Sequence, residues 1–358
     1  MAPEREGRAI SPALPRPGLR EVEPYAAPQL DVRARLNTNE CPYPLPEAFR
    51  EDLAAAVRLL PLNRYPERDA DEVRERLAEV NGQRVEGTWV ANGSNEVIQQ
   101  LMLAYAGPGR RVVVFDPTYG LHARLAWVAS SDVAHIALEQ PWRLGSEQVT
   151  SALEDDPDVV FVCSPNNPTG NAQPVEIVAE LATRGEALVV VDEAYIEFGG
   201  QSALGLVADH PNVIVVRTFS KAFALAGARI GYCFGAPEVI EDLRRVRLPY
   251  HVSALTQAAG LVALDHMTDA LAIVDAVRSE RDRVLEALPG LGVEAFASDA
   301  NFVLFRTPHP TERVWQDLLD RGVLVRDFGR VMPGCLRVTA GTPEEIDLFL
   351  SALEEVLR

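Results

Sequence analysis

Short apolar runs alternate with longer stretches of helical periodicity from about residue 85 to residue 235. The runs are rich in valine and isoleucine: 88–91, 111–116, 133–138, 159–164, 187–192, 213–218 and 230–234. Strands that are apolar on both faces and separated by helices predict an α/β fold, with a mainly parallel seven-stranded sheet between helices. Ligands of such sheets bind beyond the carboxyl ends of the strands.

The pattern changes after Gly235. One long helix is predicted from Ser253 to about Leu288, where Pro289 and Gly290 end it. A smaller α+β domain should follow, with strands at 302–306, 323–327 and 336–339 and helices at about 311–321 and from residue 343. We therefore expect a proline-rich N-terminal arm at 1–32, a first part of the small domain at 33–64, a large domain at 65–252, and the long helix with the small C-terminal domain at 253–358.

Composition excludes several classes of protein. Of 358 residues, 47% are hydrophobic and 24% are charged, which is ordinary for a globular chain. The formal net charge of −18 argues against general binding to nucleic acid or to anionic membranes. The closest cysteines, Cys163 and Cys233, are 70 residues apart, so no metal-ligand spacing exists. With no secretory signal and no long apolar run, we expect a cytoplasmic protein without a metal.

Polar motifs follow several of the predicted strands. Ser94 or Asn95, after Gly93, can cap a helix whose free N–H groups suit a phosphate. In the turn 164–170, Asn167 stands between two prolines, where its amide can donate to an oxyanion. Asp192 ends an apolar strand, and a buried carboxylate there needs a metal, an arginine or a protonated ring nitrogen as its partner. Tyr195, three residues on, can reach the same site.

Lys221 is the only lysine in the chain, so the other 33 basic residues are arginines. It follows the strand 213–218, next to Ser220, and Arg229 comes eight residues later. A neutral lysine amine forms Schiff bases, which arginine cannot do, and burial lowers the pKa of a lysine. A nucleophilic amine, a carboxylate, an amide, a phenol and a phosphate-binding helix terminus together match the groups that pyridoxal 5′-phosphate requires.

The chain resembles the fold-type I pyridoxal-phosphate-dependent aminotransferases, and within them the members that act on histidinol phosphate. The resemblance covers nearly the whole chain. It is carried by the stretches 35–40, 64–66, 92–96, 164–170, 192–195, 220–221, 247–250, 298–302 and 336–341. Three departures stand out: Cys41 replaces the family's usual Asn, Asn95 stands where many relatives have Asp, and the arm reads Tyr-Ala-Ala-Pro at 25–28 rather than the commoner Tyr-x-Pro-Gly.

The resemblance implies a role for each site residue. Lys221 would hold the cofactor as an internal aldimine, Asp192 would pair with its ring nitrogen, and Tyr195 is the third catalytic residue. Further cofactor contacts are expected from Ser94, Asn95, Tyr119, Asn167, Ser220 and Arg229, and from Tyr65 of the neighbouring subunit in a homodimer. Tyr25, Asn39, Asn167, Arg326 and Arg337 are the expected substrate-binding residues.

The implied reaction exchanges an amino group between L-histidinol phosphate and 2-oxoglutarate, with imidazole acetol phosphate and glutamate as the other pair, in histidine biosynthesis. Two alternatives share the fold and the cofactor: an aminotransferase for aromatic or other amino acids, and a decarboxylase of a phosphorylated amino acid. A dinucleotide oxidoreductase or a P-loop enzyme is not indicated, because neither a Gly-x-Gly-x-x-Gly turn nor a Gly-Lys pair occurs. Arg326 and Arg337 each occur in an apolar strand run of the small domain, where they can bind a substrate dianion or form surface salt bridges.

Overall fold

The computed structural model of the chain describes residues 13–24 and 27–358. They divide into two compact units, the first ending at Leu30 and the second beginning at Asp31. The first unit contains one short 3-10 helix, Leu19–Glu21. Tyr25 lies outside the described residues. In the described part of the chain, no helix is long and apolar enough to cross a membrane.

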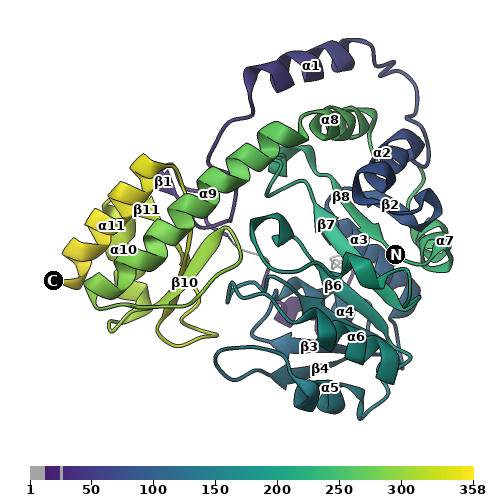
Figure 1. Cartoon of the computed structure of the whole chain (residues 1–358). Coiled ribbons are helices and arrows are strands. Elements are labelled where there is room, and N and C mark those ends of the chain that lie inside the picture. Colours follow the sequence, from purple (N-terminus) through teal and green to yellow (C-terminus); the bar gives the residue numbers. More distant parts are fainter. Residues whose placement is uncertain (1–12, 25–26) are drawn as a thin grey trace, which may run out of the picture. The chain divides into compact units, whose positions relative to one another are not determined.

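A seven-stranded sheet forms the centre of the second unit (Figure 1). Across the sheet its strands are β2 (Thr88–Ala91), β8 (Gly231–Phe234), β7 (Val213–Thr218), β6 (Leu188–Asp192), β5 (Val159–Cys163), β3 (Arg111–Asp116) and β4 (Asp132–Ala137). Neighbouring strands are parallel, except that β8 runs antiparallel to both β2 and β7. The predicted mainly parallel α/β sheet is confirmed, and its strand bounds agree with the sequence pattern to within one residue.

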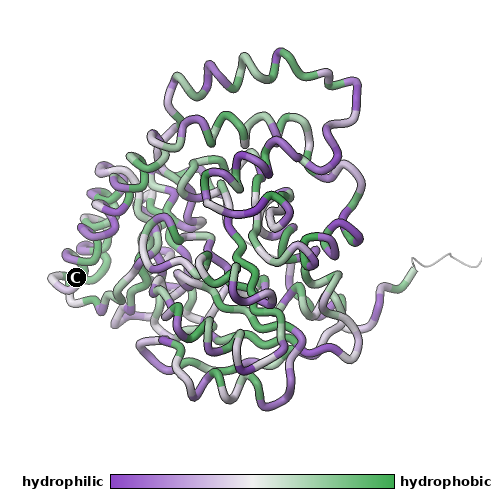
Figure 2. The backbone as a smooth tube through the Cα atoms, turned by 45° about the vertical axis from the view of Figure 1, so that its right-hand side comes forward, coloured by the Kyte–Doolittle hydropathy of each residue, from purple (hydrophilic) through white to green (hydrophobic). Residues whose placement is uncertain are grey.

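Helices cover both faces of this sheet because its strands are apolar on both sides. They are α2 (Asp71–Asn81), α3 (Ser94–Tyr105), α4 (Leu121–Val128), α5 (Ser146–Leu153), α6 (Val175–Arg184), α7 (Pro237–Val246) and α8 (Ala254–Asp265). On β6, Leu188 and Val190 pack in one cluster with α3, α4 and α7, whereas Val189 and Val191 pack with α5 and α6. Because side chains alternate between the two faces along a strand, the same pattern decides on which face of the sheet a polar residue at the end of a strand lies. Figure 2 shows the hydrophobic segments gathered in the interior of this unit.

The smaller domain is built on a four-stranded antiparallel sheet in the order β12 (Arg326–Asp327), β13 (Cys335–Thr339), β10 (Phe302–Arg306) and β9 (Glu294–Ala295). Strand β1 (Ala34–Arg35) pairs in parallel with β11 (Val323–Leu324). A separate apolar cluster joins these strands to α9 (Met267–Ala287), α10 (Thr311–Asp320) and α11 (Pro343–Leu357). Leu336 and Val338 belong to this cluster, so Arg337, between them on β13, faces the other way.

Two sequence predictions are wrong in detail. The helix predicted from Ser253 to Leu288 is two helices, α8 and α9, which meet at His266. The strand predicted at 323–327 is also two strands: β11 pairs with β1, and β12 pairs with β13. Apolar periodicity continues across both breaks, so the sequence pattern alone does not reveal them.

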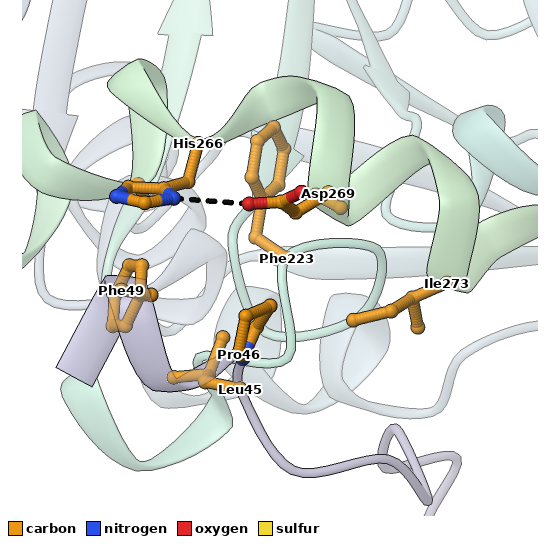
Figure 3. A pocket seen from close by; sticks show the side chains of 9 residues that line it. Leu45, Pro46, Phe49, Phe223, His266, Asp269 and Ile273 are labelled. Atoms are coloured by element: carbon orange, nitrogen blue, oxygen red, sulfur yellow. Dashed lines mark hydrogen bonds and ion pairs between the residues drawn. The ribbon is translucent and has the colours of Figure 1, made fainter.

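His266 links the two helices to α1 (Glu47–Arg58), which packs on α8. Its Nδ1 lies 3.0 Å from Asp269 Oδ2, and its Nε2 lies 2.8 Å from Asp52 Oδ2. These two carboxylates raise the pKa of His266, because each favours the charged imidazolium. The imidazole lies beside a small pocket that is lined by Phe49 and by Phe223 of the loop after Lys221 (Figure 3).

We predict that the contribution of His266 to stability depends on pH. Because the pKa of His266 is higher in the folded state, the protonated imidazole stabilises the fold at pH values below its unfolded-state pKa of about 6.5. This stabilisation is lost as the pH rises through the folded-state pKa. His266→Gln should therefore lower the melting temperature by about 1–2 °C at about pH 5.5, since exposed ion pairs are weak, and by less at about pH 9. Asp52→Asn should show the same trend in differential scanning fluorimetry. An equal loss at both pH values would contradict this assignment.

Candidate functional site

Three neighbouring parallel strands bring the polar motifs of the sequence together at their carboxyl ends. Asp192 is the last residue of β6, Asn167 lies in the turn after β5, and Ser220 and Lys221 follow β7. Strand β6 pairs with β5 on one side and with β7 on the other. Residues that are tens of positions apart in the sequence therefore share one edge of the sheet, as the position of ligand sites in such folds leads one to expect.

Asp192 is buried and is held by a histidine that the sequence analysis missed. It shares the sheet face of Leu188 and Val190, which α3, α4 and α7 cover. From α4, His122 places Nε2 2.9 Å from Asp192 Oδ2, and its ring stacks on Phe161 with centroids 4.4 Å apart. The sequence signal that could have revealed this partner is the lone histidine in the largely apolar stretch 121–128, and the structure buries it completely.

The amine of Lys221 lies next to the small-domain side of the site. Its Nζ donates to the main-chain oxygen of Thr38 at 3.1 Å and lies 5.8 Å from the centre of the Tyr195 ring. Burial, with further repulsion from Arg337 and Arg229, lowers the pKa of Lys221 to about 8, although Glu40 acts in the opposite direction. A larger fraction of this amine is therefore neutral near neutral pH than in a lysine exposed to water, and the neutral form is the one that a nucleophile or a general base requires.

Two side-chain amides donate hydrogen bonds to the phenol oxygen of Tyr195. The Nδ2 groups of Asn39 and Asn167 donate to its oxygen at 3.0 and 3.5 Å. Asn39 is itself fixed, because its Oδ1 accepts from Thr339 Oγ1 at 3.0 Å. Burial raises the pKa of Tyr195, so its hydroxyl keeps its proton and can donate a hydrogen bond.

Two arginines of the small domain stand opposite each other. Arg326 of β12 and Arg337 of β13 are direct partners in the antiparallel register. Arg337 is buried, donates to Asn167 Oδ1, and donates to the main-chain oxygen of Asn37 at 2.9 Å. Like charges directly opposite on neighbouring strands repel, so this pairing favours a bound anion.

The amino end of α3 forms a cradle with β8 and Arg229. The Nη1 of Arg229 lies 3.4 Å from Ser220 Oγ, and a Cβ on Gly93 would lie 2.5 Å from Arg229 Nη2. A Cβ on Gly231 would lie 2.0 Å from the main-chain nitrogen of Ser94, and Gly93 has a φ of 85°, so the backbone favours glycine at both positions.

The predicted helix cap is wrong. Neither Ser94 nor Asn95 caps α3. Gly93 is the N-cap residue at φ 85°, and Ser94 and Asn95 occupy the first two helical positions. N–H groups at these positions have no partner inside the helix.

The structure brings most of the predicted residues into this cluster, with two exceptions. Tyr119 joins it: its ring meets His122 edge to face at 5.5 Å, and its hydroxyl lies 3.5 Å from Asn95 Oδ1. Tyr65 lies apart, 79% exposed, with its ring stacked on Tyr250 at 4.5 Å. Tyr25 falls outside the described residues.

Comparison with known proteins identifies the family of this chain. Residues 34–353 match the model of the family "Aminotransferase class I and II". A histidinol-phosphate aminotransferase of Streptomyces avermitilis is 48% identical over 357 residues (94% of this chain and 95% of the relative), and one of Frankia casuarinae is 46% identical over 358 residues (96% and 90%). The structure of histidinol-phosphate aminotransferase from Sinorhizobium meliloti in complex with pyridoxal-5′-phosphate has the same fold, with a TM-score of 0.82 at 24% identity over 91% of each chain. The chain therefore belongs to the class I and II aminotransferases, and within them to the histidinol-phosphate aminotransferases.

Proposed function

We propose that this chain exchanges an amino group between L-histidinol phosphate and 2-oxoglutarate, with imidazole acetol phosphate and glutamate as the other pair, at a site that holds pyridoxal 5′-phosphate. When bound, this cofactor supplies a carbonyl carbon that accepts the amino group and a protonated ring that withdraws electrons from the substrate's Cα. The residues of the site supply the charges, donors and acceptors around it.

The residues present fit this cofactor. Its phosphate requires a small concave site with many donors. Gly93 and Gly231 let Arg229 and the first turn of α3 approach closely, and the amides of Ser94 and Asn95, the hydroxyl of Ser220 and the guanidinium of Arg229 can donate. No metal is needed to balance this charge.

Each remaining group has a defined task. The Asp192 carboxylate, held by His122, would keep the ring nitrogen protonated, and Tyr119 would pack against the ring. Asn167 and Tyr195 would hold the ring oxygen. Lys221 would bind the cofactor through its amine and, once released, carry a proton to and from the substrate's Cα.

The observation that carries the substrate assignment is the register of Arg326 with Arg337. Two guanidiniums on one face of a sheet suit a dianionic group such as a phosphate monoester, or a carboxylate that binds to one of them. We expect Arg337 to bind the carboxylate of glutamate and the phosphate of histidinol phosphate, with Arg326 assisting for the phosphate. Asn39, which Thr339 fixes, and Tyr25 would line the same side.

We further propose a homodimer with shared sites. The rings of Tyr65 and Tyr250 stack on each other, and both residues are exposed to solvent. Leu62 and Leu248, which are close to them in the sequence, are 64% and 72% exposed. An exposed apolar patch of this kind is typical of a protein interface. Tyr65 would cross this interface to the phosphate of the partner's cofactor.

Arg326→Ala should lower kcat/KM for histidinol phosphate about 10- to 100-fold, the value of one or two charge-assisted hydrogen bonds, and change that for glutamate by less than about threefold. Steady-state kinetics with each amino donor measure the two effects. Arg330→Ala, an exposed arginine four residues further on, is the matched control and should change neither value. Equal losses for both donors would refute the phosphate role of Arg326.

The shared site can be tested by mixing two defective variants. Lys221→Ala lacks the amine, and Tyr65→Ala should lose about 10- to 100-fold in cofactor affinity, so each homodimer should be nearly inactive at limiting cofactor. Random reassociation after mild denaturation gives half heterodimers, each with one intact site, so activity should recover to about a quarter of the wild-type value. No recovery, with heterodimers demonstrated by mass spectrometry, would mean that Tyr65 serves its own subunit.

A further inference from the structure

A buried ion pair lies under the carboxyl ends of β6 and β7, on the sheet face opposite to Asp192. Glu193 continues the alternation of Val189 and Val191, and Arg217 continues that of Val213 and Val215, all of which face α5 and α6. The side chains of Glu193 and Arg217 are 1% and 11% exposed. Neither is part of the site described above.

Both charged groups are fully engaged. Arg217 Nε donates to Glu193 Oε2 at 3.0 Å, its Nη2 donates to Ser202 Oγ at 2.8 Å, and its Nη1 donates to Asn81 Oδ1 at 3.1 Å. Glu193 also accepts from Ser202 Oγ at 2.9 Å and from the main-chain nitrogen of Ala203 at 2.6 Å. The pair thus fastens the end of β6, the end of β7, the turn at Ser202 and the last residue of α2 to one another.

The position of this pair gives it a specific consequence for the site. The main-chain pairing of β6 with β7 continues as far as the bond from Glu193 N to Val216 O, at 2.8 Å. Asp192 precedes Glu193 directly, and Lys221 follows Arg217 by four residues. The side-chain pair therefore continues the connection between the two strands at the point where the main-chain ladder stops and the functional residues begin.

Stability alone does not explain an ion pair at this place. The rest of β6 before Asp192 is valine and leucine, and well-packed apolar residues usually stabilise a core at least as well as a buried ion pair does. What an arginine fork adds is direction, because it holds a carboxylate in one geometry. Arg217 also faces Tyr232 and Glu197, and burial raises the pKa of Glu197 to about 7 while Arg217 opposes that shift.

We propose that Arg217 and Glu193 are positioning residues for amino-group transfer: their buried pair sets the separation of Asp192 and Lys221 by locking the ends of β6 and β7. The inference rests on the proposed cofactor site but not on the identity of the substrate.

The test uses the cofactor-loaded enzyme and compares Arg217→Lys and Glu193→Gln with Arg74→Lys. Arg74 is the matched control, since it is also buried, donates to the main-chain oxygens of Thr88 and Val85 at 2.8 Å, and fastens α2 to the edge strand β2. For each variant we would measure the melting temperature, the dissociation constant of pyridoxal 5′-phosphate, the pH midpoint of the absorbance change of the bound cofactor, and kcat and KM for glutamate.

All three variants should lose thermal stability. Only Arg217→Lys and Glu193→Gln should shift the pH midpoint of the absorbance change of the bound cofactor, by at least about 0.5 pH unit, because the environment of Lys221 changes. Their kcat should fall about 10- to 100-fold, the usual effect of a small misplacement of reacting groups, with KM for glutamate within about twofold. The proposal would be overturned if Arg217→Lys and Glu193→Gln lost as much thermal stability as Arg74→Lys but kept the wild-type midpoint and the wild-type kcat.

Two further features keep the test decisive. Glu193→Gln is nearly isosteric, so it decides the question if Arg217→Lys does not fold. If the wild-type enzyme does not turn over histidinol phosphate, the substrate assignment fails. The pH midpoint of the absorbance change and the cofactor affinity still test the positioning role of the pair in that case.

Discussion

The amine of Lys221 is held where burial and two nearby guanidiniums, those of Arg337 and Arg229, oppose its positive charge. A lysine in water is almost entirely protonated at neutral pH and is a poor nucleophile, whereas one with a pKa of about 8 is neutral often enough to react. The same guanidiniums are also suited to the phosphate groups and carboxylates that approach the amine. One electrostatic arrangement thus prepares the nucleophile and attracts the ligands.

This arrangement depends on the parallel sheet. The strands β5, β6 and β7 bring Asn167, Asp192 and Lys221 to one edge, and the small domain adds Arg337 from the opposite direction. The interior of the sheet is apolar, so burial of its side chains offsets the cost of the charged groups that are collected at its end. The polar residues are themselves paired, with Asp192 on His122 and Glu193 on Arg217.

The sequence was sufficient to predict the sheet, because short runs of valine and isoleucine that alternate with helices are typical of buried parallel strands. It also indicated Lys221, because the chain contains no other lysine. It did not reveal partners that meet through tertiary contacts: His122 is 70 positions from Asp192, and the register of Arg326 with Arg337 depends on a turn that hydrophobic periodicity does not describe. The break at His266 was missed for a related reason, since two helices in line have the same apolar pattern as one.

The central claim is that the Lys221 side chain is the group that holds the cofactor. Reduction of the pyridoxal 5′-phosphate-loaded protein with borohydride, followed by peptide mapping in a mass spectrometer, tests it most directly. We predict a single cofactor adduct per chain, on the peptide that contains Lys221. An adduct on the N-terminal amine instead, or no stable adduct at all, would contradict it.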